Sequence, residues 1–189
     1  MSISSFSIST ASQVEELLSK TPHSKGVIID LRNNPGGIVE EAVGVARQFI
    51  NGGIIVSYQK DSGEKVIFES TESGADQAPL IVLINSSTAS AAEILAAALQ
   101  DRNRAVILGE KSYGKGTVQR NMGIDPNSGF FSSNSELGTL KLTLQKFYRV
   151  NGGSTQLRGV SSDIILPDNL ENLKIREEDN EDALAWDEI

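Results

Sequence analysis

Apolar residues recur along this chain with two different periods, and each period predicts a different kind of element. Spacings of three to four positions predict three helices, at 11–18 with Thr10 as the N-cap, at 39–50 and at 90–101. Short apolar runs rich in β-branched residues predict buried strands at 26–31, 79–84, 104–108 and 163–167. The first half of the chain therefore alternates strands with helices.

Two other regions of the chain carry a period of two. Residues 54–59 and 65–69, joined by Asp61-Ser-Gly63, predict a β-hairpin. Strict alternation over 139–147 predicts a strand with one face in water, and residues 125–129 and 151–153 predict turns. We expect an α/β protein with several strand–helix units and a β-rich C-terminal third.

Composition narrows the classes of function. A length of 189 residues, 39% of them hydrophobic, predicts one core domain at 1–176, followed by an acidic segment at 177–189. We expect that segment to be a solvated tail, although Trp186 and Ile189 offer it a way to dock. A net charge of −8 argues against nucleic acid as a partner. The absence of cysteine excludes disulfides, one histidine argues against zinc, and no apolar stretch is long enough to span a membrane.

Ser90 is the first candidate for chemistry. It opens an alanine-rich helix and stands three residues before Glu93, which is the spacing of a capping box and needs no catalysis. The same position between a strand and a helix would project the hydroxyl outward. It would also turn the free amide of Ala91 toward a developing oxyanion.

Lys115 is the second candidate, in the turn Gly114-Lys-Gly116 after a predicted strand. An exposed turn lysine is the plain interpretation. With burial, a deprotonated lysine would activate a serine without any histidine. A phosphate-binding loop matches 109–115 in part, but Gly116 replaces the Ser/Thr that holds magnesium, and no helix follows.

The loop Asp30-Leu-Arg-Asn-Asn-Pro-Gly-Gly37 is the third element. The loop is typical of a strand-to-helix turn in which only glycine fits sterically. The loop could also supply the second donor of an oxyanion hole, which acyl transfer requires. That donor would be the backbone amide of Gly36 or of Gly37.

These segments together resemble the C-terminal processing (tail-specific) proteases, serine peptidases with a Ser-Lys dyad. The resemblance is carried by 27–37, 87–94 with 98–101, and Tyr113-Gly-Lys-Gly-Thr-Val-Gln119, followed by 140–152 and 159–167. It implies a fold related to the ClpP and crotonase superfamily. By position it makes Ser90 the nucleophile, Lys115 the general base and Gln119 the residue that orients the lysine. Gly36 and Ala91 match the oxyanion amides.

Asp101 matches an acid of the tail-specific branch, and a plain charge at a helix end explains it equally well. The resemblance implies an endopeptidase that cuts unfolded or weakly structured polypeptides near their C-termini. It implies no metal or organic cofactor, and a periplasmic or otherwise exported protein. Residues 1–6 do not look like a signal peptide, and we expect the chain to begin inside the protease domain, without the family's PDZ domain.

Two other functions stay open. A non-catalytic peptide-binding or scaffold module could hold an extended segment in the same groove. A hydratase acting on acyl-CoA, from the related superfold, is disfavoured because Ser90 and Lys115 would have no role in it.

Overall fold

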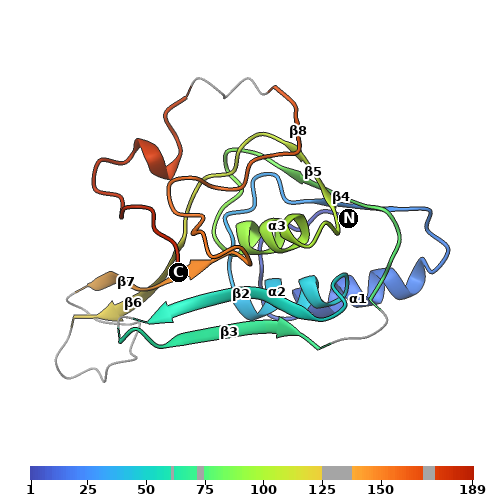
Figure 1. The fold of residues 1–189 in the computed structure, drawn as a ribbon, viewed down its shortest axis with the longest axis horizontal. Coiled ribbons are helices and arrows are strands. Elements are labelled where there is room, and N and C mark those ends of the chain that lie inside the picture. Colours follow the sequence, from blue (N-terminus) through green and yellow to red (C-terminus); the bar gives the residue numbers. More distant parts are fainter. Residues whose placement is uncertain (61, 72–74, 125–137, 168–172) are drawn as a thin grey trace.

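The computed structural model describes residues 1–60, 62–71, 75–124, 138–167 and 173–189 (Figure 1). The predicted turn at 125–129 and residue 61 of the predicted hairpin turn lie outside the described residues. In the described part, the helices and strands are α1 (Thr10–Lys20), β1 (Val27–Asp30), α2 (Val39–Arg47), β2 (Gly53–Lys60), β3 (Lys65–Ser70), β4 (Leu80–Ile84), α3 (Ala91–Asp101), β5 (Val106–Gly109), β6 (Thr117–Gly123), β7 (Thr139–Tyr148), β8 (Ile164–Ile165) and the short 3₁₀ helix η1 (Glu177–Asp179).

The four predicted buried strands form one parallel sheet in the order β1-β4-β5-β8. Alternate side chains such as Ile29, Val82 and Ile107 are buried in the core that the sheet shares with the helices. The opposite face is not covered in the described structure, and Ile28 and Ile165 are 51% and 75% exposed there. The strands of this sheet are therefore buried on one face, because the helices pack on that face only.

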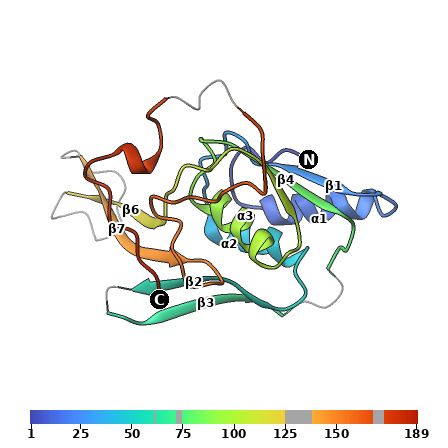
Figure 2. The same cartoon turned by 45° about the horizontal axis from the view of Figure 1, so that its top comes forward.

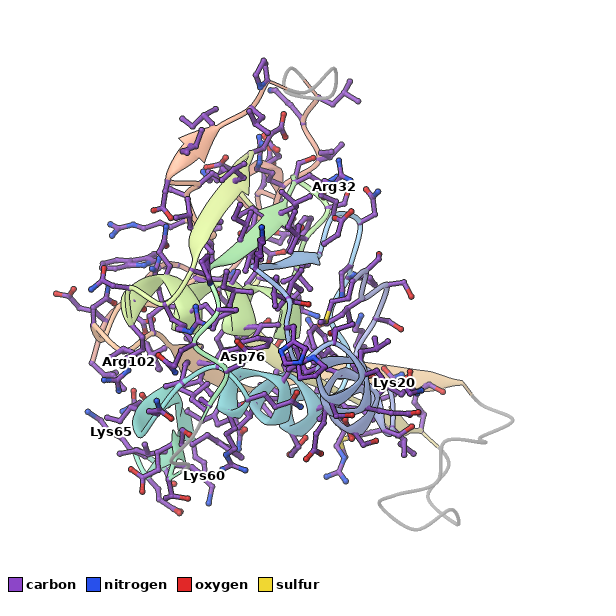
Figure 3. All side chains as sticks on the ribbon, turned by 90° about the vertical axis from the view of Figure 1, so that its right-hand side faces the viewer. Lys20, Arg32, Lys60, Lys65, Asp76 and Arg102 are labelled. Carbon is purple, nitrogen blue, oxygen red and sulfur yellow. The ribbon has the colours of Figure 1, made fainter. Side chains whose placement is uncertain are left out.

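The second sheet is antiparallel, in the order β3-β2-β7-β6, and the predicted hairpin forms its β2–β3 half. Helix α3 lies between the two sheets, α2 packs against α3, and α1 packs against α2 (Figures 1 and 2). In Figure 3, Lys60 and Lys65 mark this hairpin at the bottom of the molecule, and Arg32 lies at the top beside the parallel sheet. The site loops described below lie at the carboxyl edge of that parallel sheet.

Strand β6 was not predicted as a separate element, and β7 differs from its prediction. Residues 139–144 are exposed on both faces, including the apolar side chains of Leu140, Leu142 and Leu144. This half of β7 pairs with β6, whereas β2 pairs only with residues 145–148. The outer half of the strand therefore extends past the core that would have covered one face.

The acidic C-terminal segment is mostly exposed, but it is attached to the domain. The indole of Trp186 donates to Ser154 O at 2.9 Å, and Arg158 stacks on the same ring. Ion pairs join Lys146 to Asp187 at 3.0 Å and Lys111 to Glu178 at 2.8 Å. The segment is therefore not a free, solvated tail, because Trp186 and the basic side chains of the domain bind it.

Candidate active site

Three loops that carry the candidate residues follow the carboxyl ends of neighbouring parallel strands. Residues 31–38 follow β1, residues 85–90 follow β4, and residues 110–116 follow β5. These strands lie next to one another in the order β1-β4-β5. The carboxyl edge of a parallel sheet is where such folds place their ligand sites, so the topology brings the three motifs of the sequence together.

Hydrogen bonds fasten the first loop to the second. The Asn33 amide donates to Asn85 Oδ1 at 2.9 Å, and Asn85 Nδ2 returns a bond of 2.9 Å to Asn33 Oδ1. The Ala89 amide donates to Asn34 O at 2.9 Å. The residue before Ser90 is thus held by the loop that contains Gly36 and Gly37.

Ser90 stands between β4 and α3 in an unusual backbone conformation, with φ 58° and ψ −119°. This region favours glycine, and a non-glycine residue there costs on the order of 1–3 kcal/mol. Ser90 is the N-cap residue of α3 and forms a capping box with Glu93, whose carboxylate accepts the Ser90 amide at 2.8 Å. The strained turn holds the Ser90 hydroxyl at the start of the helix.

Two backbone amides beside Ser90 bear on the predicted oxyanion hole. Among the described residues, the Ala91 amide has no hydrogen-bond acceptor, so it is free to donate. Gly36 lies against it: a Cβ at Gly36, where φ is +101°, would come within 2.8 Å of Ser90 Cβ and 3.0 Å of Ala91 N. The Gly36 amide, however, donates to Asn34 Oδ1 at 2.8 Å, whereas that of Gly37 has no acceptor in the described structure.

Glu93 joins the serine to the lysine loop. Its carboxylate is fully buried and accepts the amides of Ser90, Gly114 and Lys115 at 2.8, 2.7 and 2.9 Å, as well as the Ser112 hydroxyl. Burial raises the pKa of Glu93 to about 7, against the opposing effect of these four donors. One side chain therefore fixes the backbones on both sides of the site.

Lys115 is partly buried, two residues before β6 begins. Burial lowers the pKa of its ammonium group, and the charge of Lys141 lowers it further, while Glu177 and Glu93 act in the opposite direction. Within the described residues its Nζ makes no hydrogen bond or ion pair. An amine of this kind is available as a base, and the strand that follows it excludes a phosphate-binding loop of the usual strand–loop–helix form.

The two remaining candidates lie elsewhere. Gln119 is exposed on β6, and the partner of its side-chain amide is Thr143 Oγ1 at 3.4 Å, not Lys115. Asp101 lies at the other end of α3, about 16 Å from Ser90 at 1.5 Å per residue. There it pairs with Arg149 at 2.6 Å. Among the described residues, neither side chain makes a hydrogen bond to Ser90 or Lys115.

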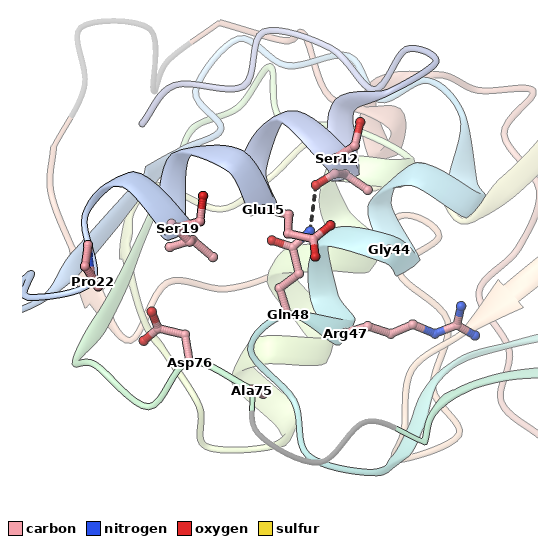
Figure 4. Close-up of a pocket in the computed structure, with 11 residues that line it drawn as sticks. Ser12, Glu15, Ser19, Pro22, Gly44, Arg47, Gln48, Ala75 and Asp76 are labelled. Atoms are coloured by element: carbon pink, nitrogen blue, oxygen red, sulfur yellow. Dashed lines mark hydrogen bonds between the residues drawn. The ribbon is translucent and has the colours of Figure 1, made fainter.

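A pocket of about 500 Å³ opens beside Gly37, between the start of α2 and the antiparallel sheet. Most of its lining is apolar, and it contains the side chains of Ile38, Val39, Tyr58, Val66, Phe68 and Val118. A larger hollow of about 780 Å³ lies between α1, α2 and residues 75–76 (Figure 4), where Gln48 donates to Ala11 O at 2.7 Å. That hollow shares no residue with the three loops, so the pocket beside Gly37 is the one that belongs to this site.

Two residues of this arrangement were not predicted from the sequence as parts of the site. Glu93 was interpreted only as half of a capping box, and the capping spacing was the available signal. Gln156 is buried, and its Oε1 accepts the amide of Gly116, next to Lys115, at 2.8 Å. No local pattern in the sequence indicates this contact across 40 residues.

The described residues contain no group of three histidines or acidic side chains able to hold a metal ion. Their helices also lack the combination of length and apolar character needed to cross a bilayer. The arrangement offers a serine hydroxyl at a strained turn, a partly buried amine, a free amide donor and an adjacent apolar pocket. These are the parts that acyl transfer to a serine requires.

Comparison with known proteins agrees with this chemistry. The model of Peptidase family S41 matches residues 1–166. The tail-specific protease of Haemophilus influenzae is 41% identical over 191 residues, which cover 99% of this chain and 27% of that protein. The carboxy-terminal-processing protease of Bartonella bacilliformis is 39% identical over 157 residues, which cover 81% of this chain and 34% of that protein. The chain thus spans about a third or less of the length of these relatives.

Solved structures extend the comparison to the fold. The photosystem II D1 C-terminal processing protease superposes with a TM-score of 0.73 at 30% identity, covering 89% of this chain and 42% of that one. Mature CPAF superposes with a TM-score of 0.72 at 16% identity, covering 94% of this chain and 48% of that one, which supports the fold alone. The predicted α/β protease-core fold class is confirmed.

Proposed function

Because this chain belongs to Peptidase family S41, we propose that it is the catalytic core of a serine endopeptidase that cuts polypeptides near their C-termini. Ser90 is the nucleophile and Lys115 the general base. The observation that carries the proposal is the convergence of the loops after β1, β4 and β5. There the buried carboxylate of Glu93 links the strained turn of Ser90 to the backbone of Lys115, whose Nζ makes no hydrogen bond or ion pair within the described residues.

In the acylation step, neutral Lys115 takes the proton of the Ser90 hydroxyl as Oγ attacks the scissile carbonyl carbon. The carbonyl oxygen becomes an oxyanion, which accepts a hydrogen bond from the Ala91 amide. Loss of one such donor typically costs about 10²–10³ in rate. Gly37 is the better second donor as the loop stands, since the Gly36 amide is held by Asn34. Collapse of the tetrahedral intermediate passes the proton from Lys115 to the leaving amine.

Deacylation repeats the chemistry with water. Lys115 removes a proton from a water molecule that attacks the Ser90 ester, and then returns it to Ser90 Oγ as the new carboxylic acid leaves. Gln119 and Asp101 stay in the proposal only as residues that position the site and do not take part in proton transfer. Gln119 would have to leave Thr143 to reach Lys115, and Asp101 would act through α3.

The substrate class follows from the pocket beside Gly37. Its apolar lining fits an apolar side chain next to the scissile bond, with the chain laid along the groove toward Ser90. An unfolded polypeptide exposes such side chains, whereas a folded domain buries them. Export of the natural protein from the cytoplasm remains a prediction based on the family resemblance.

The test is cleavage of β-casein near pH 8, followed by mass spectrometry. Ser90→Ala, Lys115→Ala and the double variant should each lose activity by about 10³-fold or more, with no further loss in the double variant. Lys111→Ala is the matched control, since it also removes a lysine from the 110–116 loop. The Lys111 side chain pairs with Glu178 at the surface. Its activity should remain near that of the parent.

The pH dependence gives a second measurement. Lys115 acts as a base only when neutral, so activity should rise with pH through its lowered pKa and level off above it. Additive losses of activity in the double variant would contradict the Ser90–Lys115 dyad. An activity that stays constant from acidic to alkaline pH would contradict it as well. Binding of casein without cleavage would instead favour a peptide-binding module.

A further inference from the structure

The acidic C-terminal segment lies outside the region matched to the family, which ends at residue 166. Its 3₁₀ helix η1 nevertheless packs against the loop that carries Lys115. The Glu177 amide donates to Tyr113 O at 3.1 Å, and Arg176 pairs with the buried Glu110 at 3.3 Å. The segment, with Arg176 just before it, is therefore attached to the 110–116 loop at Glu110, Lys111 and Tyr113, since Lys111 also pairs with Glu178 at 2.8 Å.

Gln156 provides a second route between Glu177 and Lys115. This side chain is fully buried, and it uses both ends of its amide. Its Oε1 accepts the Gly116 amide at 2.8 Å, and its Nε2 donates to Glu177 Oε1 at 3.1 Å. The Glu177 carboxylate is thus one hydrogen-bonded side chain away from the residue that follows Lys115.

The charges around Lys115 come from three elements. Lys141 on β7 is repulsive, whereas Glu177 on η1 and Glu93 on α3 are attractive. Glu177 also lies close enough to the Tyr113 phenol to help raise its pKa, after burial. Of the two attractive carboxylates, Glu177 has the larger effect on the ammonium group of Lys115.

We propose that Glu177 is a positioning residue for the base: through Tyr113 and Gln156 it fixes the Lys115 loop, and its charge sets how readily Lys115 accepts a proton. The inference rests on the proposed function, because it concerns the same lysine. It makes the acidic C-terminal segment a working part of the site and not a solvated appendage.

The experiment separates charge from position with two substitutions. Glu177→Gln keeps an oxygen for Gln156 and removes the charge, whereas Glu177→Ala removes both. Glu178→Gln and Glu178→Ala are matched controls on the same turn, since Glu178 pairs with Lys111 at the surface. Proteins carrying ¹³C,¹⁵N-labelled lysine are titrated by NMR, and the Lys115 side-chain signal is assigned by its loss in Lys115→Arg.

Lys115 should titrate at lower pH in Glu177→Gln than in the parent, and the rise of casein cleavage with pH should move in the same direction. Glu177→Ala should in addition lower kcat by about tenfold at the plateau, because the loop is displaced. Both Glu178 variants should follow the parent. An unmoved Lys115 titration in Glu177→Gln, or an equal shift in Glu178→Gln, overturns the proposal.

The NMR titration does not depend on turnover. If the parent cleaves nothing while the Lys115 signal still responds to Glu177→Gln, the proposed function fails and the coupling between Glu177 and Lys115 stands. If the parent cleaves casein and the signal does not respond, the dyad stands and the role of Glu177 fails.

Discussion

The two ends of helix α3 each hold a carboxylate inside the protein, and they hold it in opposite ways. At the N-terminal end, Glu93 is fully buried and accepts hydrogen bonds from neutral donors on both sides of the candidate site. At the C-terminal end, Asp101 is paired with the guanidinium of Arg149 by bonds of 2.6 and 3.1 Å. Among the described residues Glu93 makes no ion pair, whereas Asp101 makes one with Arg149.

This difference separates a site from an anchor. An ion pair satisfies its charges and leaves little free for chemistry, so Asp101 and Arg149 serve to hold β7 and its following residues to α3. A carboxylate held by neutral amides organises backbone without cancelling the charge of a nearby lysine. Four predictions test this contrast between the two ends of α3, from the largest expected effect to the smallest.

Glu93→Gln should have the largest effect, a loss of about 4 kcal/mol in the free energy of unfolding. Either amide orientation turns an NH₂ group toward two donors, and each buried donor left without an acceptor costs about 1–3 kcal/mol. Urea unfolding of the variant measures the loss. Glu110→Gln is the control, because Glu110 is also buried but has one ion pair, with Arg176. Equal losses in the two variants would contradict the special role of Glu93.

The pH dependence of stability sharpens the same point. The pKa of Glu93 is about 7 in the folded protein, against an ordinary value of 4.5, so the folded state binds the proton more tightly. Its contribution is fully present below pH 4.5 and is lost as the pH rises through 7. The stability difference between the parent and Glu93→Gln should therefore shrink by about 3 kcal/mol over that interval. A constant difference from pH 4 to pH 8 would show that Glu93 stays ionised when buried.

Asp101→Asn should cost about 2 kcal/mol, less than a fully buried pair because both side chains retain some exposure. A double-mutant cycle with Arg149→Met should recover most of that amount as coupling energy. We expect turnover to fall only as far as the protein unfolds. A variant as stable as the parent but inactive would instead give Asp101 a direct part in catalysis.

Ser90→Gly should have the smallest effect on stability, and it is a gain relative to Ser90→Ala and not a loss. Glycine adopts φ 58° without strain, so this variant should be more stable than Ser90→Ala by about 1 kcal/mol, although both lack the nucleophile. Thermal unfolding of the two variants measures the difference. If Ser90→Gly is the less stable of the two, the turn before α3 is not strained. Arg102, the C-cap of the same helix, has an ordinary φ of −89° and predicts no such gain for glycine.

Much of the fold was predictable from local pattern. The helices and the parallel strands were predicted within a few residues, because each is a contiguous run with its own period. Strand β6 was missed because its sequence, Thr117-Val-Gln-Arg-Asn-Met-Gly123, lacks apolar alternation and is paired by β7. The exposure of Ile28 and Leu142 was also missed, because coverage of a strand depends on where other elements pack.

The sequence by itself determined the three motifs, the candidate nucleophile and base, and the family they indicate, since these depend on residue identity and spacing. The tertiary structure alone decided that Glu93 ties Ser90 to Lys115, that Asp101 pairs with Arg149, that Gln119 bonds to Thr143, and that the acidic segment reaches the Lys115 loop. Each of these is a contact between residues that are distant in the sequence. Hydrogen bonds and burial depend on distance in space, which local periodicity does not encode.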